Sequence, residues 1–157
     1  MDPVVQEIVL DSALTAAPTP DPMLATTIPS GTGDVTFASL LNQVRADNGA
    51  GPVTYDSRLD QAAQLHAEDM LENGYFAHAG LNGSSVGTRV QEQGYNFARV
   101  GENIGRGYQS EQTVLNGWVN SPGHQRNNID PRFEEFGLGY VRDENDTRWV
   151  LVLGTEQ

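Results

Sequence analysis

Apolar residues recur every three or four positions along the middle of the chain, which is the pattern of amphipathic helices. The clearest case places Phe37, Leu40, Leu41 and Val44 on one face before Asn48-Gly49 ends the segment. A second helix begins with Asp56 or Ser57 as its N-cap and closes at Asn73-Gly74. Together the pattern predicts four helices, over residues 37–48, 56–73, 86–93 and 110–118.

The C-terminal part of the chain has the composition of strands. Residues 136–141 and 149–153 are rich in apolar and aromatic residues, and they flank the polar run at 143–146, which is typical of a hairpin loop. A third short strand is expected near residues 100–104. Helices first and strands last, without βαβ alternation, predict an α+β fold in which helices pack on a small antiparallel sheet.

Residues 1–34 differ from the rest in composition. They are rich in Ala, Thr, Pro, Ser and Gly, and four prolines between positions 18 and 29 interrupt any regular element. We interpret them as a leader or linker before a single domain at 35–157. Residues 4–10 are apolar enough to pack on the domain as a short strand or helix, or they form a loose tail. The start, Met1-Asp2-Pro3, has no basic or apolar signal-peptide region.

The net charge and the absence of cysteine exclude several classes of function. The 157 residues include 9 Lys and Arg against 21 Asp and Glu, a net charge of -12 that repels nucleic acid and anionic lipid surfaces. There is no cysteine, which excludes disulfides, thiol catalysis and Cys-ligated zinc. No apolar stretch reaches the roughly 18 residues that a membrane span needs. These features predict a globular protein that does not bind nucleic acid and does not span a membrane.

The three histidines lie in different settings. His66 is on the apolar face of an Ala-rich helix, where a hydrogen-bonded core histidine is the common outcome. His78 and His124 follow Ala77 and Gly123 in connections between elements, and polar residues there are more often functional. Glu102 stands between glycines that let the backbone approach other elements. Walker A, Gly-x-Ser-x-Gly and His-Glu-x-x-His motifs are all missing.

Four short motifs follow in an order that resembles the CAP family, also called SCP-like proteins, in its bacterial branch. The likeness covers about residues 37–155. The motifs are Tyr75-Phe76-Ala77-His78, Gly101-Glu102-Asn103-Ile104, Trp118-Val119-Asn120-Ser121-Pro122-Gly123-His124 and Gly137-Leu138-Gly139-Tyr140. The resemblance implies an α-β-α sandwich, with a central antiparallel sheet between helical layers, and an extracellular or periplasmic location.

The resemblance also implies a groove and its residues. His78, His124 and Glu102 would line it and hold a divalent cation, most often zinc, since imidazole and carboxylate groups are ordinary zinc ligands. Asn103 and Ser121 would lie in the same groove. Plant and animal members carry a second glutamate shortly after the tryptophan, where this chain has Asn120 and Ser121, and Glu111 is a weak substitute.

Three functions stay open at this point. The leading hypothesis is an exported binding module that holds a divalent cation and a small hydrophobic or peptide-like ligand. The alternatives are a metal-dependent hydrolase, with Glu102 as base toward a zinc-bound water, and a structural polar cluster without metal. No residue is assigned a catalytic role. Trp118 is expected to be buried with Val114 and Leu115 on the inner face of its helix.

Overall fold

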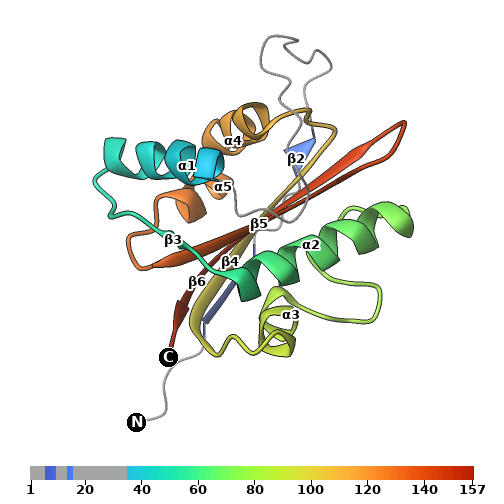
Figure 1. The fold of residues 1–157 in the computed structure, drawn as a ribbon, viewed down its shortest axis with the longest axis horizontal. Coiled ribbons are helices and arrows are strands. Elements are labelled where there is room, and N and C mark those ends of the chain that lie inside the picture. The colour runs from blue at the N-terminus through green and yellow to red at the C-terminus, as the bar shows by residue number, and fades with distance from the viewer. Residues whose placement is uncertain (1–5, 10–13, 16–34) are drawn as a thin grey trace.

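The computed structural model describes residues 6–9, 14–15 and 35–157, in which helices lie on both faces of one sheet (Figure 1). The helices are α1 (Val35–Asp47), α2 (Ser57–Glu72), α3 (Val86–Glu92), α4 (Glu111–Val119) and α5 (Pro122–Asn128). The strands are β1 (Gln6–Val9), β2 (Leu14–Thr15), β3 (Thr54–Tyr55), β4 (Phe97–Arg106), β5 (Glu135–Arg142) and β6 (Thr147–Glu156). The predicted α+β sandwich is confirmed.

The four predicted helices are present, and α2 has the expected end signals. The Asp56 side chain accepts hydrogen bonds from the backbone amides of Arg58 and Leu59 and so caps α2. Gly74, at a φ of 66°, follows the end of that helix. Ser110 caps α4 in a reciprocal pair with Thr113.

The prediction for the segment after α4 was wrong. Ser121-Pro122-Gly123 was expected to open an irregular connection, but Pro122 is the first residue of a fifth helix, α5. Proline fits there because the first residues of a helix have no intrahelical use for their N–H groups. His124 therefore lies in the first turn of α5 and not in a loop. The strand expected at 100–104 is also longer, because β4 pairs with β6 along its whole length.

The sheet has the order β1-β4-β6-β5-β3, and β2 also pairs with β4. The long strands β4, β6 and β5 are antiparallel, as expected. The short strands at the two edges are parallel to their neighbours, so the sheet as a whole is mixed. Of the apolar segment 4–10, residues 6–9 form β1, while residues 4, 5 and 10 lie outside the described part.

Two apolar cores separate the layers. Helices α1, α4 and α5 cover one face of the sheet, and α2 and α3 cover the other (Figure 1). Strand β6 serves both cores, because Trp149 and Leu151 point to the first and Val150 and Val152 to the second. The expected burial of Trp118 is confirmed, since it is 0% exposed and donates a hydrogen bond to the carbonyl of Ile104. No helix among the described residues is long and apolar enough to cross a bilayer.

Helix α2 lies unusually close to β5, which explains the Gly137-Leu138-Gly139 part of the last motif. A Cβ on Gly137 would lie 2.1 Å from the backbone nitrogen of Asp60, and one on Gly139 would lie 2.4 Å from the carbonyl carbon of Ala63. This closeness lets polar side chains of α2 bond to the β5 backbone. Asp60 accepts from the amide of Leu138, and Gln64 bonds to both the amide and the carbonyl of Tyr140.

Replacing Gly139 by alanine should therefore destabilise the fold. The methyl group would meet helix backbone rather than a movable side chain, so we expect Gly139→Ala to lower the free energy of unfolding by about 3 kcal/mol. Urea denaturation followed by circular dichroism measures this. Gly51→Ala is the control, since a Cβ there meets nothing within 4 Å. Equal midpoints for Gly139→Ala and Gly51→Ala would refute the close approach.

Asp60 should make stability depend on pH. Burial raises its pKa from 3.8 to about 6, against the lowering effect of the Leu138 amide. The folded state then binds a proton more tightly than the unfolded state, so stability falls as pH rises from about 4 to 6. Asp60→Asn keeps an oxygen for the Leu138 amide without the charge. At pH 7.5 we expect it to be about 1–2 kcal/mol more stable than the parent, with the gain shrinking toward pH 4.

Thermal and urea unfolding of both proteins across that pH range would check the Asp60 effect. Asp47→Asn, at an exposed site on α1, controls for the loss of one negative charge. A variant whose advantage over the parent is the same at pH 4 and pH 7.5 would contradict the assignment.

Candidate functional site

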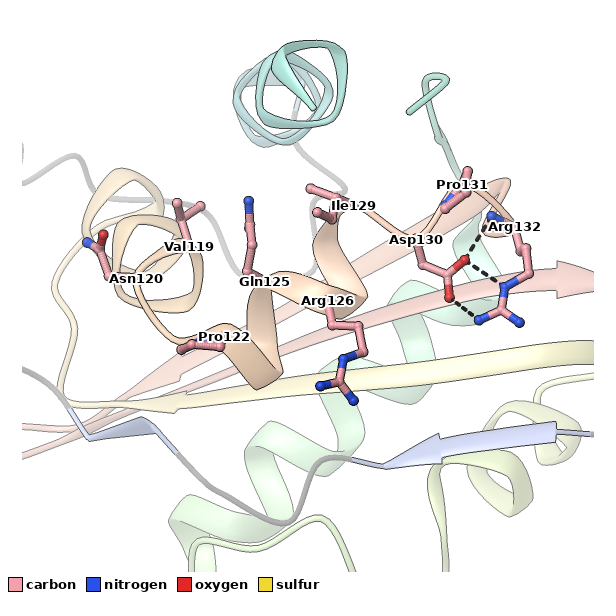
Figure 2. A pocket seen from close by; sticks show the side chains of 9 residues that line it. All are labelled: Val119, Asn120, Pro122, Gln125, Arg126, Ile129, Asp130, Pro131 and Arg132. Carbon is pink, nitrogen blue, oxygen red and sulfur yellow. Dashed lines mark hydrogen bonds and ion pairs between the residues drawn. The ribbon is translucent and has the colours of Figure 1, made fainter. Parts of the chain in front are cut away.

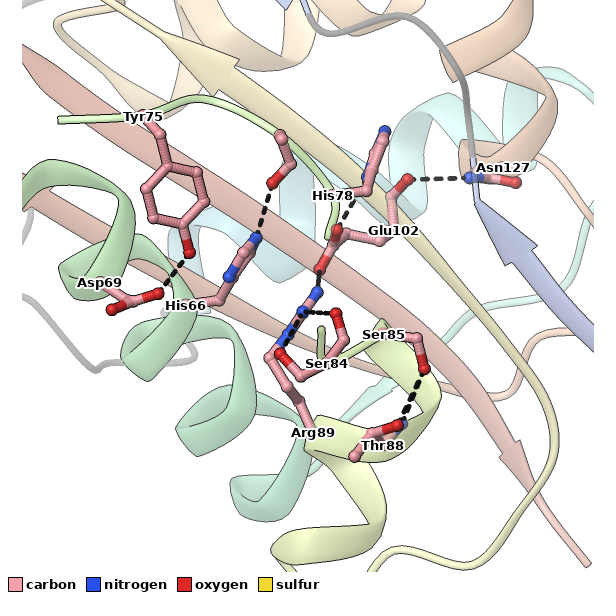
Figure 3. A network of polar contacts seen from close by, with 11 residues as sticks. His66, Asp69, Tyr75, His78, Ser84, Ser85, Thr88, Arg89, Glu102 and Asn127 are labelled. Carbon is pink, nitrogen blue, oxygen red and sulfur yellow. Dashed lines mark hydrogen bonds and ion pairs between the residues drawn. The ribbon is translucent and has the colours of Figure 1, made fainter. Parts of the chain in front are cut away.

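The centre of the candidate site is a carboxylate with no solvent exposure. Glu102 lies in the middle of β4 and is 0% exposed. Its Oε1 is 2.7 Å from Nδ1 of His78, and its Oε2 is 2.9 Å from a guanidinium nitrogen of Arg89 (Figure 3). Each carboxylate oxygen therefore has a polar partner, which is the condition for keeping a charge buried.

Arg89 brings α3 into the site. It lies between Val86 and Val90 on the buried side of that short helix and is itself 8% exposed. A second guanidinium nitrogen donates to the carbonyl and hydroxyl oxygens of Ser84. Burial raises the pKa of Glu102, but the hydrogen bond from His78 and the charge of Arg89 outweigh it, and the pKa ends below its usual value. Glu102 is thus held as a carboxylate.

His78 lies in the connection between α2 and α3, as the sequence predicted. Because an ionised carboxylate only accepts hydrogen bonds, Nδ1 of His78 carries the proton and donates it to Glu102. Its Nε2 is shielded from solvent and has no hydrogen-bond partner among the residues that the structure describes. An imidazole held through Nδ1, with Nε2 left over, is the usual arrangement of a metal-binding histidine.

His124 reaches the site from the opposite layer. It is 1% exposed, and its Nδ1 is 2.8 Å from the hydroxyl of Ser121, directly before α5. The Nδ2 group of Asn103 donates to the backbone carbonyl of His124, and Asn127 donates to the backbone carbonyl of Glu102. These amide bonds fasten α5 to β4 beside Glu102. Of the predicted groove residues, Asn103 and Ser121 thus position His124.

Glu102 and Asn103 point to different faces of the sheet. The side chains two residues on either side of Glu102, Val100 and Ile104, pack in the core under α2 and α3, whereas Asn103 bonds to α5. Glu102, whose side chain bonds to His78, and Asn103, whose side chain bonds to the backbone of His124, therefore face different layers.

The structure does not bring His78, Glu102 and His124 together as a set of three ligand atoms. In the described part of the chain, the group of three such residues with ligand atoms within 4.8 Å is Asp56, Glu135 and Glu156. That group already has polar partners, since Arg58 pairs with Asp56 and Glu156 and the Tyr95 hydroxyl donates to Glu135. It is best described as a hydrogen-bonded acidic cluster.

His66 is a core residue, as the sequence predicted. It is 2% exposed, and its Nε2 is 2.9 Å from the carbonyl oxygen of Ala77. Burial lowers its pKa, which favours the neutral ring, although the charge of Glu102 acts in the opposite direction. Its bond to Ala77 fixes the backbone directly before His78. His66 therefore supports the site without belonging to it.

Sequence reasoning missed two residues that build the site, Arg89 and Asn127. The sequence around Arg89 does contain a clue. Arg89 precedes Val90 and lies on the buried side of a seven-residue helix, and a buried cation needs an acidic partner. Around Asn127 there is no such clue, since the helix that carries it was not predicted. Glu111, the proposed substitute for the second glutamate, is buried in the first turn of α4.

A cavity of about 680 Å³ lies beside α5 (Figure 2). Its apolar lining comes from the end of α4, the start of α5 and the segment that follows: Val119, Pro122, Ile129 and Pro131. Arg126 also lines it, as do Asp130 and Arg132, which form an ion pair with each other. The volume suits a small hydrophobic ligand with a polar end.

Comparison with protein families matches this chain to the cysteine-rich secretory protein family (CAP) over residues 38–153. Two proteins of Bacillus subtilis are similar over 111 residues each, or 71% of this chain. They are the uncharacterized protein YkwD, at 32% identity, and the uncharacterized membrane protein YlbC, at 31%. The aligned part is 42% and 32% of those proteins, so this chain spans less than half of either.

Solved structures show the same fold. An extracellular protein from Bacillus anthracis that contains an SCP domain is 27% identical, with a TM-score of 0.72 over 77% of this chain and 39% of that one. An outer surface protein of Borrelia burgdorferi has a TM-score of 0.70 at 22% identity, over 78% of this chain and 91% of that one. The second likeness concerns the fold alone.

Removing the Arg89 guanidinium should destabilise the fold, because Glu102 would stay buried without that counter-charge. Arg89→Met leaves Glu102 without its main counter-charge, so we expect the free energy of unfolding at pH 7.5 to fall by about 3–5 kcal/mol. Part of the loss should return near pH 5, because the unpaired carboxyl would then take up a proton. The double variant Arg89→Met with Glu102→Gln serves as control and should recover most of the loss. An Arg89→Met protein with parental stability and pH profile in urea unfolding would show that the pair is not coupled.

Proposed function

This chain belongs to the CAP family, and on that premise we propose that it is an exported binding module whose groove holds a divalent cation, with zinc as the best fit. The cation would be held by His78 and His124. The observation that carries the proposal is the hydrogen bond from His78 to the buried carboxylate of Glu102. Metal-binding histidines usually donate their second ring N–H to such a carboxylate, which fixes the ring and makes it a better ligand.

The contacts of Glu102 favour a supporting role over direct coordination. Glu102 was predicted to be a metal ligand, yet its Oε1 bonds to His78 and its Oε2 to Arg89. To bind a metal, Glu102 would have to give up one of these bonds inside the protein, at a cost. We therefore propose two imidazole ligands, His78 and His124, with further positions left to water or to a bound ligand.

The same contacts weigh against the hydrolase alternative. A general base toward a zinc-bound water needs access to that water and a pKa near the working pH. Glu102 is fully buried and its pKa is lowered, so it is a poor base. No observation favours another residue for that role, and the proposal remains a binding function.

Two further observations bear on the ligand and on location. The cavity beside α5 is lined by Pro122 and Gln125, which flank His124 in the same helix, and its volume fits a small hydrophobic group. The solved relative from Bacillus anthracis is described as an extracellular protein, which supports export of this chain as well. We propose that the domain begins near residue 35, and the start of the family match at residue 38 supports this.

Zinc titration separates ligands from supporting residues. At pH 7.5 we expect measurable binding by calorimetry in the parent, and loss of most of the affinity in His78→Ala and His124→Ala. Glu102→Gln should weaken binding by about 10- to 100-fold, the usual effect of removing a carboxylate behind a metal ligand. Zinc affinity should fall in acid, because a protonated imidazole cannot coordinate.

His66→Ala is the matched control, a buried histidine of the same region that should change stability more than zinc affinity. Equal affinity in the parent and all histidine variants would contradict the proposal, as would no binding at millimolar zinc. Either outcome would leave the structural polar cluster as the better account of these residues.

A further inference from the structure

The outer edge of β4 is covered in an unusual way. Among the described residues, the long antiparallel strands are β4, β6 and β5, with β4 at one side of the three. The outer side of β4 pairs with β1 and β2, which precede the region matched by the family, residues 38–153 (Figure 1). The rest of the sheet is formed by the domain itself.

The opposite side of the sheet is closed by the domain's own side chains. Asp60 accepts from the amide of Leu138, and Gln64 bonds to both backbone groups of Tyr140. Strand β3 pairs with the start of β5. A strand edge without such protection is a template for pairing with another segment. The domain protects β5 in this way along most of its length.

On β4 the domain covers only the middle of the edge. The indole of Trp118 donates to the carbonyl of Ile104, and Asn127 donates to that of Glu102. Strand β1 pairs with residues 99–102, so Glu102 also takes part in that pairing, and β2 pairs with residues 105–106, beyond Ile104. The register changes by two residues between them, where the side chains from α4 and α5 reach the strand.

We infer that the outer edge of β4 is a docking site for an extended peptide that runs parallel to β4, and that β1 and β2 occupy it as a tethered segment of the same chain. Both strands are parallel to β4, so no tight hairpin holds them there. Residues 16–34 separate β2 from α1. Parallel pairing is slightly less stable per residue than antiparallel pairing, so two short parallel strands are exchangeable, and their place in the same chain supports the pairing through high effective concentration.

The docking edge leads directly to the candidate metal site. Val9 pairs with Glu102, the residue whose side chain bonds to His78 and Arg89. Backbone hydrogen bonds to β4 would supply most of the affinity for a peptide. The side chains around Glu102 would contact the peptide residue after the one paired with Glu102 and so provide specificity. An extended peptide is thus the ligand inferred for the groove, which rests on the proposed binding function.

The test uses the full chain with β1 weakened. Successive backbone N–H groups along a strand point to opposite sides, so one of Glu7 and Ile8 directs its N–H toward β4. Proline has no N–H, so the double variant Glu7→Pro with Ile8→Pro removes that hydrogen-bond donor in either case. The probe is a fluorescent peptide of residues 4–17, followed by anisotropy in metal-free buffer with a chelator. We expect the double-proline protein to bind the peptide about tenfold more tightly than the parent, whose edge is filled by the tethered segment at high effective concentration.

Two controls make the result specific. Thr26→Pro with Thr27→Pro places the same substitutions outside both strands and should leave peptide binding at the parental level. A peptide that carries the two prolines itself should not bind any of the proteins. Amide hydrogen exchange at residues 99–102 should be faster in the Glu7→Pro and Ile8→Pro protein, and the peptide should slow it again.

The inference is overturned if the double-proline protein binds the peptide no better than the parent. It is also overturned if the parent is a dimer by light scattering and the prolines make it a monomer, because the edge would then be filled by a second copy. Since no metal is present, a failure here is distinguishable from a failure of the zinc site.

Discussion

The fold and the candidate site both depend on the buried carboxylate of Glu102. A charge without solvent contact is tolerated only when its partners are fixed, and here Arg89 from α3 and His78 from the preceding connection supply them. The bonds tie both segments to β4. With Nδ1 of His78 bonded to Glu102, Nε2 of the same ring has no hydrogen-bond partner among the described residues. The nitrogen that does not serve the buried charge is therefore available as a ligand atom.

The strand that carries this carboxylate divides the site between two layers. Side chains at 100, 102 and 104 face α2 and α3, while Asn103 faces α5 and holds His124 through its backbone carbonyl. The edge of β4 is the place where the two layers meet, and β1 and β2 lie along that edge. Metal binding and peptide docking are therefore proposals about one location in the fold.

The sequence predicted the elements that have strong local signals. Phe37 and Leu41 on one helical face, the Asp56 cap and the apolar strands at 136–141 and 149–153 were all interpreted correctly. Helix α5 was missed because Pro122 is compatible with both a helix start and a turn. The pairing of Glu102 with Arg89 was not predicted, since it joins residues of different elements. The close approach at Gly137 and Gly139 likewise follows only from the packing of α2 on β5.

The central claim is that His78 donates through Nδ1 to Glu102 and offers Nε2 to a metal. Nitrogen-15 NMR of the histidine rings, in protein labelled at histidine, tests this most directly. The account predicts that His78 carries a proton on Nδ1 at pH 7.5 and that zinc shifts its Nε2 resonance together with a ring nitrogen of His124, while His66 is unaffected. A His78 ring without a proton on Nδ1, or ring signals of His78 and His124 that zinc leaves unchanged, would contradict it.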